Sequence, residues 1–137
     1  MEEELIGPSR PSIHLLVRGN EWTKFLQTAG FDAEIRHFEI PVDMEKLVPP
    51  NSRGIVIVSP RFCNSNESTV ILVQDIRISF AGPIVVLGDE HAADGRSPLR
   101  VRGGANFSVR IAPAAIMQPE LGQLIDDLLV ELAMPQS

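Results

Sequence analysis

Side chains that could do chemistry are few in this sequence and lie far apart. The one cysteine, Cys63, has no histidine beside it that would lower the pKa of its thiol, so we interpret it as a passive thiol. His14, His37 and His91 fall on separate predicted elements and lack the spacing of metal ligands. No nucleophile can be paired with a base along the chain. The sequence therefore predicts a protein that is not an enzyme and that has no metal site and no cofactor.

Three further residues follow predicted strands and could take part in binding. Asp89 and Glu90 come after an apolar run and could form a cation site with Glu21, although acids in a solvated loop are the simpler interpretation. Ser59 precedes Pro60 and could be phosphorylated or contact an anion, but a serine-proline pair after a strand is typical of a turn. We expect these residues to serve the local structure.

Composition and charge exclude several classes of protein. The 137 residues are 44% hydrophobic and 22% charged, which is typical of one folded domain. A net charge of −6 opposes direct binding to nucleic acid, which depends on clustered cations. The acidic start and the absence of a long apolar run predict no signal peptide, no membrane span and a cytoplasmic location. Four arginines, at positions 96, 100, 102 and 110, form the nearest thing to a basic patch.

Short apolar runs alternate with amphipathic stretches, as in βα units around a parallel sheet. We predict strands at residues 13–17, 33–40, 55–58, 83–87 and 107–111, and helices at 20–29, 41–48, 64–80 and 119–132. The stretch 64–80 is rich in β-branched residues, so a strand is an alternative there. Pro119 is expected in the first turn of the last helix. Residues 1–11 are predicted to be a flexible leader, 12–134 the domain and 135–137 a tail.

The predicted fold is an α/β, flavodoxin-like three-layer sandwich with five βα units, a five-stranded parallel sheet and a short or irregular fourth helix in residues 92–104. Three short sequence segments carry a family resemblance: Asp75-Ile76-Arg77, the predicted strand Pro83-Ile84-Val85-Val86-Leu87, and Gly104-Ala105 before the fifth predicted strand. With the order of the elements, they make residues 12–132 resemble the receiver (response-regulator) domains of bacterial two-component systems.

The resemblance implies a phosphorylation site, and this chain departs from it at each position. Receivers hold a divalent cation with acids after the first strand, where this sequence has Asn20, followed by Glu21. The phosphate-accepting aspartate falls on Ser59, and the hydroxyl residue that ends the fourth strand falls on Gly88. The lysine of the fifth strand falls on Ile111 or, one residue earlier, Arg110. The chain is thus expected to be a pseudo-receiver without aspartyl phosphorylation.

Receivers bind partners, or pair with themselves, through the face of the fourth helix, fifth strand and fifth helix, which maps here to residues 98–132. The resemblance therefore implies a regulatory protein–protein interaction domain of a bacterial signalling or transcription regulator, with a protein partner or a homodimer on that face. The alternative is a small-ligand-binding domain that uses the carboxyl edge of the sheet around Gly19, Ser59, Gly88 and Asp89. The candidate residues of the partner face are Arg96, Arg100, Arg102, Phe107 and Arg110.

Overall fold

The computed structural model describes residues 11–19, 21–31, 33–41, 43–49, 52–59, 62–87, 107–109 and 114–133. Strands and helices alternate along these residues, as predicted. In chain order they are β1 (Ser12–Leu16), α1 (Glu21–Ala29), β2 (Glu34–Phe38), α2 (Met44–Leu47), β3 (Gly54–Val58), α3 (Asn66–Ser79), β4 (Ile84–Leu87), β5 (Phe107–Val109) and α5 (Ala114–Ala133).

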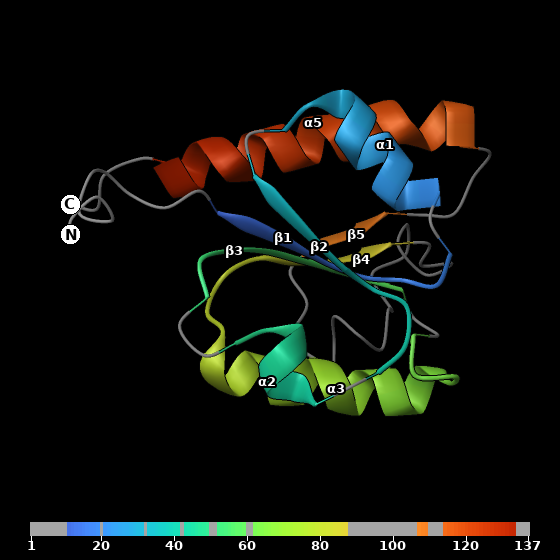
Figure 1. The fold of residues 1–137 in the computed structure, drawn as a ribbon, viewed down its shortest axis with the longest axis vertical. Coiled ribbons are helices and arrows are strands. Elements are labelled where there is room, and N and C mark those ends of the chain that lie inside the picture. The colour runs from blue at the N-terminus through green and yellow to red at the C-terminus, as the bar shows by residue number, and fades with distance from the viewer. Residues whose placement is uncertain are drawn as a thin grey trace.

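The strands form one parallel sheet in the order β2-β1-β3-β4-β5. Helices cover both faces of it, with α1 and α5 on one side and α2 and α3 on the other (Figure 1). The predicted α/β class with a parallel sheet is therefore confirmed. Among the described residues, no helix has both the length and the apolar character needed to cross a membrane.

Two apolar clusters fill the space between the sheet and its helices. Alternate residues of β3 divide between them: Ile55 and Ile57 face the α1 and α5 side, whereas Val56 and Val58 face the α2 and α3 side. All four are fully buried, as expected for a strand that is covered on both faces. Apolar side chains therefore pack against both faces of the sheet.

Helix α3 resolves the ambiguity between helix and strand in residues 64–80. Ser65 caps the helix by accepting a hydrogen bond from the Ser68 N–H at 3.1 Å. Val70, Val73 and Ile76 recur at helical spacing and are fully buried against the sheet. The burial of this apolar face outweighs the modest cost of β-branched residues in a helix.

The prediction for the start of the last helix was wrong. Helix α5 begins at Ala114, so Pro119 lies inside the helix and not in its first turn. A proline inside a helix removes one main-chain hydrogen bond but does not have to end the helix, and the preceding Ala114 and Ala115 favour helical structure. Helix α2 is also shorter than predicted, with four residues. Residues 1–10 of the leader, the tail and the predicted fourth helix lie outside the described residues.

Candidate functional site at the carboxyl edge of the sheet

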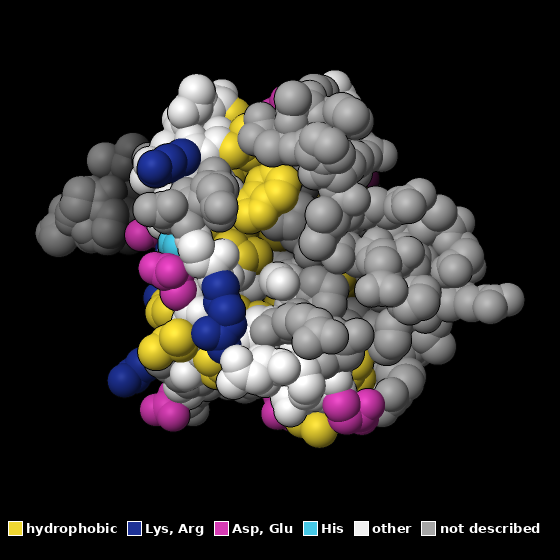
Figure 2. All heavy atoms as spheres, turned by 90° about the vertical axis from the view of Figure 1, so that its right-hand side faces the viewer, with side chains coloured by type: hydrophobic (Ala, Val, Ile, Leu, Met, Phe, Trp, Pro, Cys, Tyr) yellow, Lys and Arg dark blue, Asp and Glu magenta, His cyan; other side chains and the backbone are white. Residues whose placement is uncertain are grey.

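The carboxyl ends of β1, β2 and β3 meet at one edge of the sheet. Strand β1 lies between β2 and β3, so the chain turns in opposite directions after β1 and β3, which is where open parallel sheets bind ligands. Figure 2 views the molecule from this side, and its described part mixes basic, acidic and hydrophobic side chains. A cation site would instead need a cluster of acids.

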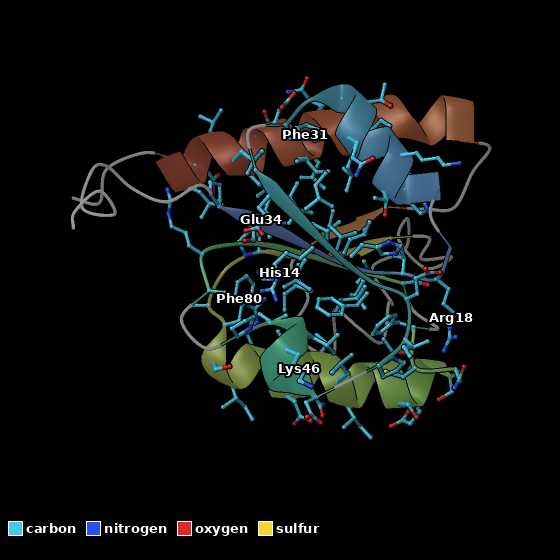
Figure 3. The ribbon with its side chains drawn as sticks, in the orientation of Figure 1. His14, Arg18, Phe31, Glu34, Lys46 and Phe80 are labelled. Atoms are coloured by element: carbon cyan, nitrogen blue, oxygen red, sulfur yellow. The ribbon has the colours of Figure 1, made fainter. Side chains whose placement is uncertain are left out.

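Arg18 lies two residues after the end of β1 and joins the loop that follows β3. Its guanidinium donates from Nη2 to the main-chain oxygen of Phe62 at 3.0 Å and to Oδ1 of Asn64 at 2.7 Å. Asn64 has a φ of 73°, a left-handed conformation that asparagine tolerates better than most residues. Figure 3 shows Arg18 at the edge of the sheet, away from both cores. We call these three residues the Arg18 latch. It places a permanent positive charge between the ends of β1 and β3.

Ser59 directly follows β3 and begins a turn. Its N–H donates to the Leu16 oxygen at 3.0 Å, and its own carbonyl accepts from the Phe62 N–H at 3.1 Å. The second bond joins residues three apart, which defines a β-turn. This geometry agrees with the interpretation of the serine-proline pair as turn chemistry. A hydroxyl in this place cannot form the acyl phosphate that an aspartate would form.

A chain of hydrogen bonds connects β2, β1 and α1 at the same edge. His37 Nε2 lies 3.0 Å from the Val17 carbonyl oxygen, so this nitrogen carries the proton, and Nδ1 accepts from the Thr23 hydroxyl at 2.8 Å. Beside it, the Gly19 N–H donates to Oε1 of Glu39 at 3.1 Å. These bonds join the ends of β1 and β2 to α1. Sequence reasoning missed them because the partners come from different elements.

The Cys63 thiol belongs to the loop between β3 and α3. Burial raises the pKa of this half-buried thiol. A hydrogen bond with the Thr69 side chain and the charge of Arg18 lower the pKa and oppose part of this rise. The Cys63 N–H donates to Oγ1 of Thr69 at 3.2 Å, which anchors the loop to α3. A raised pKa leaves little thiolate at neutral pH. This direction agrees with the interpretation of Cys63 as a thiol of low reactivity.

His14 is a titratable group away from the edge. It lies on β1 with 1% of its surface exposed, its Nδ1 donates to the Leu47 oxygen at 3.1 Å, and its ring meets Phe80 edge to face (Figure 3). Burial, followed by the charge of Arg36, lowers the pKa of His14 to about 4. Its Nε2 has no hydrogen-bond partner within the described part of the chain. At neutral pH, His14 is therefore an uncharged core residue.

The opposite, amino edge carries a cavity of about 580 Å³ whose lining includes Arg53, Gly54, Gly82 and Leu132. Arginines at this edge are used by main-chain carbonyls. Arg53 donates to the Leu132 oxygen near the end of α5, and Arg77 donates from Nη1 to the oxygens of Phe80 at 2.9 Å and Gly82 at 2.7 Å after α3. Positive charge at a helix C-terminus stabilises the helix. We assign these arginines a structural role.

Only part of the predicted site can be placed. Ser59 lies at the end of β3 and Glu21 begins α1, but the residue that joins the loops at this edge is Arg18. Phe107 begins β5, beside Val85 of β4. Among the described residues, no three histidine, cysteine or acidic side chains form a group that could hold a metal ion. The other predicted positions lie outside the described residues: Asn20, Gly88, Asp89, Glu90, Arg96, Arg100, Arg102, Arg110 and Ile111.

Comparison with known proteins adds no relative. No model of a known protein family matches the chain, and no curated protein sequence matches it.

Proposed function

We propose that this chain is a flavodoxin-like domain of the receiver type that works as a regulatory protein-binding module without aspartyl phosphorylation. The fold part of the proposal is supported by the strand order β2-β1-β3-β4-β5 and by helices on both faces of the sheet. The absence of a family match means that the proposal depends on geometry and on chemistry at individual positions.

The observation that carries the proposal is the Arg18 latch. Phosphorylation of an aspartate at this edge would need a divalent cation between the ends of β1 and β3. Here the Arg18 guanidinium lies at the end of β1 and already uses the oxygens of Phe62 and Asn64. Its charge repels a cation, and Ser59 at the end of β3 supplies no carboxylate. An α/β domain whose carboxyl-edge loops are already joined by Arg18 is suited to binding a partner through another part of its surface.

Insensitivity to a phosphoryl analogue tests the loss of phosphorylation. We expect magnesium with beryllofluoride to leave the amide NMR signals of Gly19, Ser59 and Asn64 unchanged. The Ser59→Asp variant is a matched control, and we expect it to stay unresponsive because Arg18 still repels the cation. A shift of these signals in the unaltered chain would contradict the proposal.

Partner binding tests the other half. Crosslinked partners captured from the native cell should be lost from a variant in which Arg100, Arg102 and Arg110 are replaced by alanine. Arg53→Ala at the amino edge is the matched control for removal of positive charge. If every partner stays bound to the triple variant, the partner face is elsewhere.

The competing function is binding of a small ligand at the carboxyl edge. A ligand that binds only the folded chain raises its unfolding temperature by mass action. A panel of nucleotides and common metabolites should therefore give no stabilisation if the chain is a protein-binding module. A specific rise that Arg18→Met abolishes would favour the ligand-binding function.

A further inference from the structure

We propose that the chain pairs with a second copy of itself through the exposed edge of β2, forming one continuous sheet across a two-fold axis at Ile35. This inference goes beyond the proposed function, because it concerns the outer side of strand β2 and does not depend on receiver chemistry. Strands β2 and β5 are the two outer strands of the sheet. Among the residues that the structure describes, β2 is an edge strand whose one strand neighbour is β1. No drawn helix passes in front of it in Figure 1, where α1 lies above it and α2 below.

The main-chain groups of β2 show which residues can pair outward. The Glu34 N–H donates to the Pro11 oxygen at 2.9 Å, on the β1 side. Because these groups alternate along a strand, those of Arg36 and Phe38 also point toward β1, whereas those of Ile35 and His37 point away from it. The outward N–H and C=O of Ile35 are the groups that another strand would use.

Charge selects one register for the pairing. Glu34 and Arg36 lie two residues apart on the same face of the strand, with Ile35 between them. In an antiparallel pair centred on Ile35, each Ile35 N–H donates to the Ile35 carbonyl of the other copy. Glu34 of one copy then lies directly opposite Arg36 of the other, twice over.

The neighbouring register is disfavoured by charge. A two-fold axis at Arg36 would place two guanidinium groups directly opposite each other, which is destabilising. The Arg36 side chain now donates to the Lys46 oxygen at 3.3 Å and lies 5.8 Å from the Phe38 ring centre, and it keeps further N–H groups for a carboxylate. The order Glu34-Ile35-Arg36 is thus complementary to itself, which identifies a second copy of this chain as the partner that this edge fits.

Charge reversal in sedimentation velocity tests the proposal on the full chain. The unaltered chain should shift with rising concentration toward a species of twice the 15.0 kDa mass. Glu34→Arg or Arg36→Glu alone should weaken this self-association about tenfold or more, because each places like charges opposite each other. A mixture of the two single variants should associate, since every cross-strand pair is then complementary. One chain carrying both substitutions should again self-associate.

A crosslink tests the register in the same samples. In a Cys63→Ser background, Ile35→Cys should form a disulfide between two copies, because directly opposite residues of a hydrogen-bonded antiparallel pair have Cα atoms about 5.5 Å apart. Glu39→Cys, four residues from the axis, is the matched control and should stay uncrosslinked. Thermal unfolding of each variant checks that it is folded. A chain that stays monomeric at every concentration, or a dimer that neither reversal weakens, would overturn the proposal.

Discussion

At both the carboxyl edge and the amino edge of the sheet, arginines donate hydrogen bonds to main-chain carbonyls. The two edges differ in how tightly the chain is packed there. At the amino edge, the main chain is so close that a Cβ on Gly54 would lie 1.9 Å from the Ser12 oxygen, and one on Gly82 would lie 2.7 Å from the Phe80 ring. At the carboxyl edge, the exposed Arg18 side chain donates to the exposed Asn64 side chain and to the Phe62 carbonyl. We therefore expect substitutions at the amino edge to lower the stability of the fold more than substitutions at the carboxyl edge.

The largest effect should come from Gly54→Ala. Gly54 has a φ of 155°, which side chains rarely adopt, and the added Cβ would meet the backbone of β1. We expect a loss of about 3 to 5 kcal/mol in the free energy of unfolding, measured by urea denaturation. Gly30→Ala is the control, since its positive φ of 75° is also unfavourable for a side chain but the space around it is open, and it should cost about 1 to 2 kcal/mol. Equal losses in the two variants would show that close packing at the amino edge does not add to the stability of the fold.

The second effect is a dependence of stability on pH that originates in His14. The pKa of His14 falls from 6.5 to about 4 on folding, so the unfolded chain takes up this proton more readily than the folded chain. The free energy of unfolding is therefore unaffected by protonation of His14 above pH 6.5 and falls as the pH is lowered toward 4, by about 3 kcal/mol in all. Unfolding curves at several pH values should show a shallower slope in His14→Gln, which does not ionise. Parallel slopes in the two proteins would show that His14 does not carry this effect.

The third effect compares two arginines within the amino edge. Arg77→Met removes both donors to the Phe80 and Gly82 carbonyls, which are half-buried bonds, and should cost about 2 kcal/mol. Arg53→Met removes an exposed bond to Leu132 and should cost less than about 1 kcal/mol. Urea midpoints of the two variants give the difference directly. If Arg53→Met proves the more costly, exposure is not what ranks these caps.

Local patterns in the sequence were sufficient to predict most elements. The run Ile55–Val58 predicted β3 because four consecutive β-branched residues suit a strand covered on both faces. Pro119 misled the prediction for α5, because a proline that is common in a first turn can also lie within a helix. The burial of His14 had a signal, namely its place inside the apolar run 13–17.

The site was less predictable, for a physical reason. Arg18 meets Phe62 and Asn64 across 44 and 46 residues, and His37 meets Thr23 from another element. Such contacts depend on how strands align in the sheet, which no local pattern encodes. The sequence did indicate that acids are missing after β1, because residues 18–20 contain none. What it could not indicate is that Arg18 itself joins the two loops.

The smallest effect on stability should come from breaking the Arg18 latch. Arg18→Met removes an exposed charged hydrogen bond to Asn64 and a part-buried one to the Phe62 carbonyl, and should cost about 1 kcal/mol or less. Asn64→Gly keeps the left-handed conformation and removes the other partner, so the two variants and their combination form a double-mutant cycle. We expect a coupling of about 0.5 kcal/mol in unfolding, with faster amide exchange confined to the loop between β3 and α3. A coupling as large as the cost of Arg77→Met would make the carboxyl edge as rigid as the amino edge and remove the difference between them.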